Sequence, residues 1–205
     1  MAKLMNWHGF HRKISEKRFL LFSARDLCRL FGVTDVAAMF LLHRYAKRGY
    51  IIRVKRGLYI LPDAPPPGSY LANIIYQPSY ISLTAALSHH GVIPETVYEV
   101  TSITTKSTRR FETLGKVYSY RSLQTKAYTG YRVEKENGFS FLMADPEKAF
   151  VDTCYFRLVD GLGPISRYDK EKLNWEKVLR YASLFENNKL TGMLKTQQRE
   201  YHVDG

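Results

Sequence analysis

The stretch "SARDLCRLFGVTDVAAMFLLHRYAKRG", residues 23–49, contains two helical patterns of apolar residues separated by a short turn. Ser23 is a favourable N-cap residue for the first pattern, and Gly32 stands where a glycine commonly ends a helix. Thr34 and Asp35 are suited to cap and complement the start of the second helix. Two short helices joined by a tight turn predict a helix-turn-helix motif.

Two short β-rich runs, "YIIRV" and "GLYIL", follow this motif at residues 50–61, with a basic "KRG" between them. Such runs around a glycine-containing turn predict a hairpin with a basic tip. An additional helix is expected at about residues 11–21. Three helices followed by a basic hairpin is the element order of a winged helix, so the expected fold is α+β with an N-terminal winged helix-turn-helix domain.

The positive charge of the chain is concentrated in its first third. The formal net charge is +12, and residues 1–62 hold 13 Lys and Arg against three acids, a net +10. Residues 63–205 contribute only +2. This asymmetry predicts an anionic partner for the N-terminal part, either nucleic acid or a membrane surface.

No sequence run approaches the roughly 20 apolar residues of a membrane span, and the N-terminus lacks the apolar core of a signal peptide. A soluble, cytoplasmic protein is therefore expected. Cys28 and Cys154 have no Cys or His at metal-ligand spacing, so no metal site is predicted, and Cys28 is expected to be a buried thiol.

Three consecutive prolines within "PDAPPPGSY", residues 62–70, predict a domain boundary because they cannot continue a helix or a strand ladder. The expected domains are a winged helix at 1–62, a linker at 63–69 and a second domain at 70–205. Strand-like runs between flanking helices predict a mixed α/β arrangement for the second domain.

Four segments along the chain resemble those of the AbiEi-type antitoxins, which are transcriptional regulators of type IV toxin–antitoxin and abortive-infection systems. The segments are "KRGLYIL" (55–61), "PSYISLTAALSHHGVIPE" (78–95), "VTSITTKSTRRFETLGKVYSYRSL" (100–123) and "ADPEKAFVDTCYF" (144–156). The resemblance implies a winged helix that binds and represses its own promoter. It also implies a C-terminal domain that counteracts a nucleotidyltransferase-like toxin without forming a lasting complex.

A winged helix places its second motif helix in the major groove. Helical spacing assigns one stripe of that helix to the core: Ala38, Leu42, Tyr45 and Gly49. The residues assigned to the opposite side are Thr34, Asp35, Ala37, Leu41, Arg44 and Arg48. Core or domain packing is the favoured interpretation for Phe40 and Leu41 nevertheless.

Individual DNA contacts follow from the chemistry of the side chains. Arg44 has the planar fork that can meet guanine O6 and N7, with a phosphate contact or a solvated charge as the alternatives. Thr34 is expected near a phosphate, Arg25 near the backbone, and Asp35 on the same surface. The expected phosphate or minor-groove contacts are Lys47, Arg48, Arg53, Lys55 and Arg56.

A smaller basic cluster in the second domain comprises Lys106, Arg109 and Arg110. It is interpreted either as an extension of the DNA footprint, as a site for an acidic partner protein, or as a solvated loop. Because one winged helix recognises few base pairs, two protomers are expected on operator repeats.

No catalytic residue and no cofactor is predicted. "ADPEKAF" contains acids and a lysine, as in PD-(D/E)xK nucleases, but Glu147 and Lys148 are adjacent and the segment reads as a helix start with Asp145 as its N-cap. His89 and His90 suit the end of a helix. Two other functions stay open: a DNA-targeted nuclease or nucleotide-modifying enzyme that uses Asp145, Glu147 or Asp152, and an interaction module whose basic face binds an acidic protein.

Overall fold

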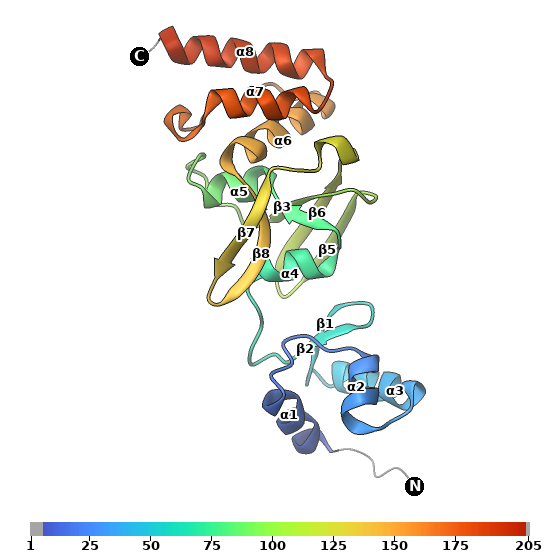
Figure 1. Ribbon diagram of the computed structural model, residues 1–205. Coiled ribbons are helices and arrows are strands. Elements are labelled where there is room, and N and C mark those ends of the chain that lie inside the picture. The colour runs from blue at the N-terminus through green and yellow to red at the C-terminus, as the bar shows by residue number, and fades with distance from the viewer. Residues whose placement is uncertain (1–5, 204–205) are drawn as a thin grey trace. The chain divides into compact units, whose positions relative to one another are not determined.

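The structure is a computed structural model that describes residues 6–203. The chain divides into two compact units after Pro66, except that Thr113–Gly115 group with the N-terminal unit (Figure 1). The N-terminal unit carries three helices and a hairpin, and the C-terminal unit is a mixed α/β sheet domain. The predicted α+β fold with an N-terminal winged helix is confirmed.

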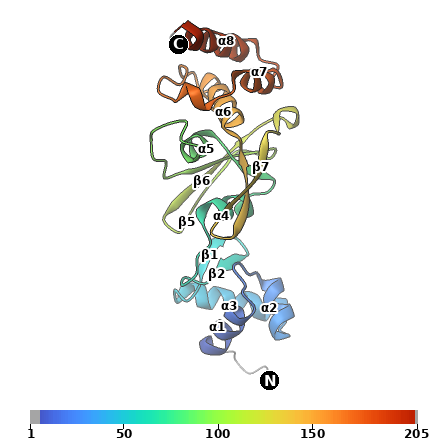
Figure 2. The ribbon, with the colours of Figure 1, turned by 60° about the vertical axis from the view of Figure 1, so that its left-hand side comes forward.

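The helices and the hairpin of the N-terminal unit lie close together (Figure 2). Its elements are α1 (Trp7–Glu16), α2 (Ala24–Phe31), α3 (Asp35–Lys47), β1 (Ile52–Lys55) and β2 (Leu58–Ile60). The bounds predicted for the first helix, 11–21, were wrong. The helix begins earlier because the Asn6 side chain accepts a hydrogen bond from the Gly9 amide at 2.8 Å. It ends earlier because the chain leaves the helical conformation at Arg18, where φ is +52°.

Helix α2 begins and ends as predicted, and α3 begins as predicted. Ser23 caps α2 through a reciprocal pair: the Asp26 amide donates to Ser23 Oγ, and Asp26 Oδ2 accepts from the Ser23 amide at 2.9 Å. Gly32 ends α2 with φ of +65°, a conformation that glycine adopts without strain. Thr34 then caps α3 by accepting from the Ala37 amide at 3.3 Å.

The predicted hairpin is confirmed as an antiparallel pair of β1 and β2 that turns at Arg56 and Gly57. Its base is attached to the rest of the unit by an isolated bridge between Phe22 and Tyr59. The Phe22 amide donates to the Tyr59 carbonyl at 2.9 Å, and the Tyr59 amide donates to the Phe22 carbonyl at 2.9 Å. This bridge fixes the hairpin, hereafter the wing, next to the segment that leads into α2.

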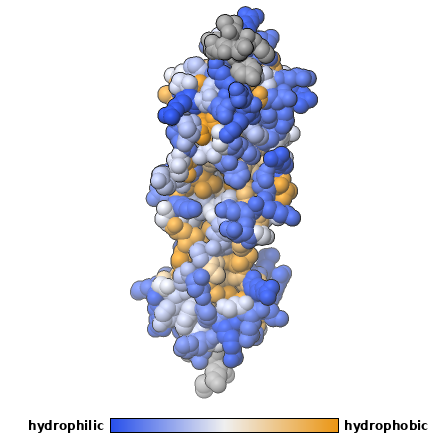
Figure 3. Space-filling view, turned by 90° about the vertical axis from the view of Figure 1, so that its left-hand side faces the viewer, coloured by the Kyte–Doolittle hydropathy of each residue, from blue (hydrophilic) through white to orange (hydrophobic). Residues whose placement is uncertain are grey.

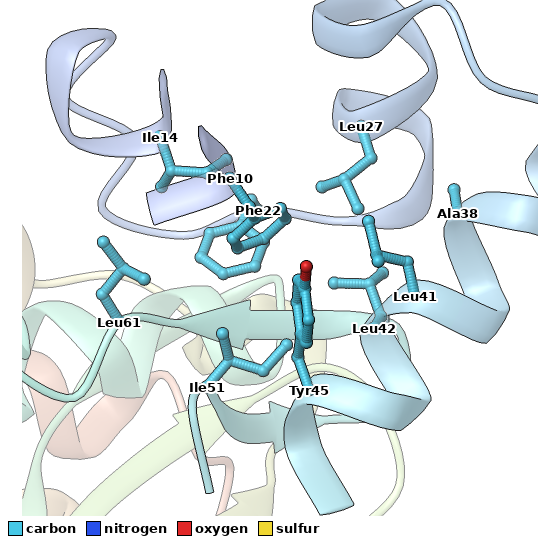
Figure 4. Close-up of a cluster of buried hydrophobic side chains, with 10 residues drawn as sticks. All are labelled: Phe10, Ile14, Phe22, Leu27, Ala38, Leu41, Leu42, Tyr45, Ile51 and Leu61. Carbon is cyan, nitrogen blue, oxygen red and sulfur yellow. The ribbon is translucent and has the colours of Figure 1, made fainter. Parts of the chain in front are cut away.

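The core of the N-terminal unit is small and rich in aromatic residues, beneath a surface on which hydrophilic residues predominate in the face shown in Figure 3. Tyr45 of α3 points into the centre of this core (Figure 4). Its ring lies 5.0 Å from that of Phe10 and 5.4 Å from that of Trp7, both edge-on. Cys28, predicted to be buried, is only half-buried at the margin of the core, because α2 presents Leu27 to the core centre instead.

The C-terminal unit is built on a six-stranded sheet with strand order β5-β6-β4-β3-β8-β7. Its elements are α4 (Gly68–Ile75), β3 (Ser79–Ile81), α5 (Leu83–His89), β4 (Val100–Thr104), β5 (Arg109–Thr113), β6 (Lys116–Ser122), β7 (Tyr131–Glu136), β8 (Phe139–Ala144), α6 (Pro146–Val159), α7 (Trp175–Ser183) and α8 (Asn188–Val203), with short 3₁₀ turns at Thr125–Ala127 and Lys170–Lys172. The sheet is mixed, since β3 runs antiparallel to β4 and parallel to β8. Helix α6 packs on α5 and α7, and α8 packs on α7.

The start of α6 carries the acids that were considered for nuclease chemistry. Asp145 is the N-cap, accepting from the Lys148 amide at 2.9 Å, as predicted. Its other oxygen accepts from the Tyr181 hydroxyl at 2.7 Å and lies 2.7 Å from Lys177 Nζ. Glu147 also pairs with Lys177, at 2.9 Å. These carboxylates therefore join α6 to α7.

One turn further along α6, a fully buried ion pair joins Lys148 and Asp152. Asp152 Oδ2 also accepts from the Tyr80 hydroxyl at 3.1 Å and from the Ser82 hydroxyl at 2.7 Å, which ties α6 to β3 and to the start of α5. Burial raises the pKa of Asp152, and Lys148 together with the two hydroxyls opposes that rise. The carboxylate thus depends on these partners to remain charged inside the unit.

We expect Asp152→Ala to lower the free energy of unfolding by about 3–5 kcal/mol, because it leaves the Lys148 ammonium buried without its partner. Urea denaturation followed by far-UV circular dichroism measures the loss. The matched control is Glu112→Ala, which breaks an ion pair with Arg110 whose side chains are both more than 60% exposed, and should cost at most about 1 kcal/mol. Equal midpoints for the two variants would show that the buried pair contributes little.

Candidate nucleic-acid interface

Helix α3 buries one face and leaves the opposite face exposed. Residues on a helix are 100° apart, so positions spaced by three and four share a face. The buried set is Ala38, Leu41, Leu42 and Tyr45. The exposed stripe runs along Val36, Met39, Phe40, His43 and Lys47.

This arrangement corrects the sequence-based assignment at three positions. Gly49 was assigned to the core stripe, but it lies beyond the end of α3 and is exposed. Leu41 was placed with the DNA-facing residues, but only 8% of it is exposed, since it is three residues after Ala38 and four before Tyr45 on the core face. Phe40 was expected to pack in the core or against another domain, and it is instead 73% exposed. Packing in the core is thus confirmed for Leu41 and wrong for Phe40.

A hollow in the N-terminal unit lies between the start of α2, α3 and the wing. Its lining residues are Ser23, Ala24, Arg25, Asp35, Met39, Leu42, Arg53, Arg56, Gly57 and Tyr59. Four of the predicted DNA-binding residues, from three separate elements, are therefore brought together here. They are Arg25, Asp35, Arg53 and Arg56, and all four are exposed. We call this the wing groove.

The cations of the wing groove are available to an external anion. Within residues 6–203, the ion pairs of the N-terminal unit join His11 to Asp63 at 2.9 Å and Arg12 to Glu16 at 3.8 Å. No carboxylate of the described chain pairs with the three groove arginines. Because surface charges without partners remain free to meet phosphate oxygens, the groove has the electrostatics of a phosphate-binding surface.

The other predicted residues of this unit have more varied surroundings. Lys47 and Arg48 are exposed at the end of α3, whereas Lys55 is half-buried. Thr34 is exposed and its hydroxyl is engaged in capping α3. Arg44 is half-buried, with its guanidinium 5.4 Å from the Tyr45 ring. Arg44 therefore packs partly on its own domain.

The basic cluster of the C-terminal unit does not form one patch. Arg109 and Arg110 are neighbours on β5, and successive side chains of a strand point to opposite faces of the sheet. Arg110 is also paired with Glu112 at 2.7 Å, and Lys106 Nζ lies 5.8 Å from the Tyr76 ring.

His90, predicted to end a helix, is the C-cap of α5, and its ring contacts the Ala144 carbonyl at 2.9 Å.

Sequence reasoning missed four residues of the exposed α3 stripe: Val36, Met39, Phe40 and His43. A signal for them was present, because Val36, Phe40, His43 and Lys47 recur at spacings of four, three and four. That signal was obscured because "VAAMFLL" is apolar on every side of the helix. Only packing of the folded unit distinguishes the buried apolar residues from the exposed ones.

Neither a metal cluster nor a membrane-spanning helix is found in the part of the chain that the structure describes. Residues 6–199, whose side chains the structure describes, contain no group of three or more His, Cys, Asp or Glu side chains arranged to hold a metal ion. None of their helices combines the length and the apolar composition needed to cross a membrane.

The helix-turn-helix, the wing and the groove between them place the N-terminal unit in the winged-helix class. Residues 13–62 match the family described as "Transcriptional regulator, AbiEi antitoxin". The match includes all of α2, α3 and the wing, and over these residues it confirms the resemblance to AbiEi-type transcriptional regulators that was inferred from the sequence. No curated protein matches the chain.

The exposed cations of this unit predict a DNA affinity that falls steeply with salt. If about six to ten phosphates are neutralised per complex, the association constant should drop by roughly 10³–10⁵ between 50 and 200 mM salt. Arg53→Ala and Arg56→Ala should each reduce the slope of log K against log salt by about 1, measured by fluorescence anisotropy.

Lys195→Ala, which removes an exposed cation of α8, is the matched control and should leave the slope unchanged. A flat salt titration of the unmodified protein, or equal slopes for all three variants, would contradict the assignment of the wing groove.

Proposed function

We propose that the protein binds operator DNA upstream of its own gene through the N-terminal unit and represses transcription from that promoter. The observation that carries this proposal is the wing groove, where Arg25, Arg53 and Arg56 come together beside the exposed face of α3 without carboxylate partners in the described chain. The family match of residues 13–62 to transcriptional regulators supports it.

In the proposed complex, α3 enters the major groove with its exposed stripe towards the base edges. The wing then follows the phosphate backbone, and Arg56 at its tip is placed to reach the adjacent minor groove. Arg25 at the start of α2 and Lys47 and Arg48 at the end of α3 contact flanking phosphates. The bridge between Phe22 and Tyr59 holds the wing at a fixed position for these contacts.

A single winged helix covers too few base pairs to specify a site in a genome. We therefore propose that two protomers bind together on inverted or direct repeats. The spacing of the repeats should then be close to one helical turn of DNA, about 10 base pairs, or a multiple of it.

Two measurements test repression. A fragment of the upstream promoter should be retained by the protein in a gel shift that resists excess non-specific competitor DNA, and a reporter driven by that promoter should be silenced in cells that express the protein. Arg53→Ala/Arg56→Ala should weaken retention at least about ten-fold and restore reporter expression, because two phosphate contacts are lost. Retention that competitor DNA removes entirely would favour an interaction module for acidic proteins instead.

The enzymatic alternative has less support from the geometry. Asp145 and Glu147 are bonded to α7, and Asp152 is fully buried with Lys148. Each carboxylate named for metal-dependent cleavage therefore has a structural partner. Metal-dependent turnover of DNA that is lost in Asp145→Ala, in a variant shown to be folded, would overturn this assignment.

We further propose that the C-terminal unit counteracts a nucleotidyltransferase-like toxin without a lasting complex. The word antitoxin in the matched family's description supports this second function. Full-length protein with Arg53→Ala/Arg56→Ala should relieve growth arrest by a co-expressed neighbouring toxin as well as unmodified protein does, since the changes lie in the other unit. Growth arrest that persists with both proteins would refute the antitoxin function.

A further inference from the structure

The exposed face of α3 is apolar along its first two turns, which is unusual for a surface that lies among cations. Val36 is 59% exposed, Met39 51% and Phe40 73%. Among the described residues, the core cluster of the N-terminal unit includes none of these three side chains. Contiguous exposed apolar surface commonly marks a binding site, so these residues require a partner with apolar groups.

The charges around this apolar face restrict what the partner can be. Met39 lines the wing groove together with Arg25, Arg53 and Arg56, so the apolar face is continuous with the cationic one. Lys47, at the other end of the exposed stripe, is also a cation. A matching partner has apolar groups on a surface that is bordered by negative charges.

The major groove of DNA has this composition when its sequence contains thymine. Phosphates border the groove, and the thymine C5-methyl is the one apolar group among the ordinary base edges that face it. Polar side chains such as Arg, Asn and Gln read bases through paired hydrogen bonds, and the first two turns of α3 present none of these on the exposed stripe. Asp35, at the start of α3, is the charged exposed residue here, and base readout by Val36, Met39 and Phe40 then relies on apolar contact.

We infer that Val36, Met39 and Phe40 recognise thymine methyl groups, and that each operator half-site carries A·T pairs whose thymines face the first two turns of α3. The inference rests on the proposed DNA-binding function and adds its sequence preference. Phe40 makes the largest contribution because its ring is the largest of the three and the most exposed.

The test removes methyl groups from the DNA and leaves everything else in place. Each thymine of the retained promoter fragment is replaced singly by deoxyuridine, which keeps base pairing and phosphates and lacks only the C5-methyl. Burial of one methyl is worth about 0.8 kcal/mol, so affinity should fall about four-fold at two or three positions of each half-site.

A protein variant completes a double-mutant cycle. Phe40→Ala should lower affinity for the thymine-containing fragment and abolish the loss caused by deoxyuridine at one position, because the contact no longer exists. The salt slope should stay unchanged, since Phe40 contacts no phosphate. Tyr98→Ala, which removes an aromatic side chain of the C-terminal unit that is 86% exposed, is the matched control and should leave the sensitivity to deoxyuridine intact.

The outcomes separate this inference from the proposed function. Specific retention of the promoter fragment with no loss at any deoxyuridine overturns methyl recognition and leaves repression standing. A fragment that is not retained at all overturns the proposed function. If Phe40→Ala instead converts a dimer to a monomer in analytical ultracentrifugation, with sensitivity to deoxyuridine unchanged, the apolar face is an interface between copies of the chain and the inference is wrong.

Discussion

The packing of Tyr45 into the aromatic cluster is the interaction on which the N-terminal unit depends. Close packing holds a helix of a folded domain at one rotation about its own axis, and Tyr45 is among the largest buried side chains of the protein. Tyr45 is held by Phe10 and Trp7 of α1, and α2 also packs on α3, so these two helices together set which side of α3 faces outwards. A change of 100° would carry Phe40 towards the core and bring core residues to the surface.

That dependence explains why local sequence patterns predicted the motif better than its surface. Ser23, Gly32 and Thr34 act on the backbone within a few residues, and their capping roles could be predicted because that chemistry is local. The orientation of α3 depends instead on contacts with residues that are distant in the sequence. In "VAAMFLL", residues 36–42, apolar character extends around the helix, and packing against the rest of the unit leaves Leu41 buried and Phe40 exposed.

In the C-terminal unit, too, polar contacts could be predicted from the sequence only where the partners are close along the chain. Asp145 could be predicted as a helix cap because its partner is three residues away. Asp152 could not be placed, because the hydroxyls that bind it belong to Tyr80 and Ser82, about seventy residues earlier in the chain. Arg109 and Arg110 appear as one basic cluster in sequence, yet the alternation of side chains along β5 separates them.

The bridge between Phe22 and Tyr59 has a consequence for how proteins of this architecture diverge. Because the wing is clamped at its base, the hairpin tip at Arg56 and Gly57 lies beyond the last cross-link to the core. Residues inserted at the tip would lengthen the hairpin while its base and α3 keep their places. Under the proposed operator binding, contacts of the wing with DNA can therefore change by exchange of the hairpin tip, and hairpins from other regulators become candidates for grafting onto this scaffold.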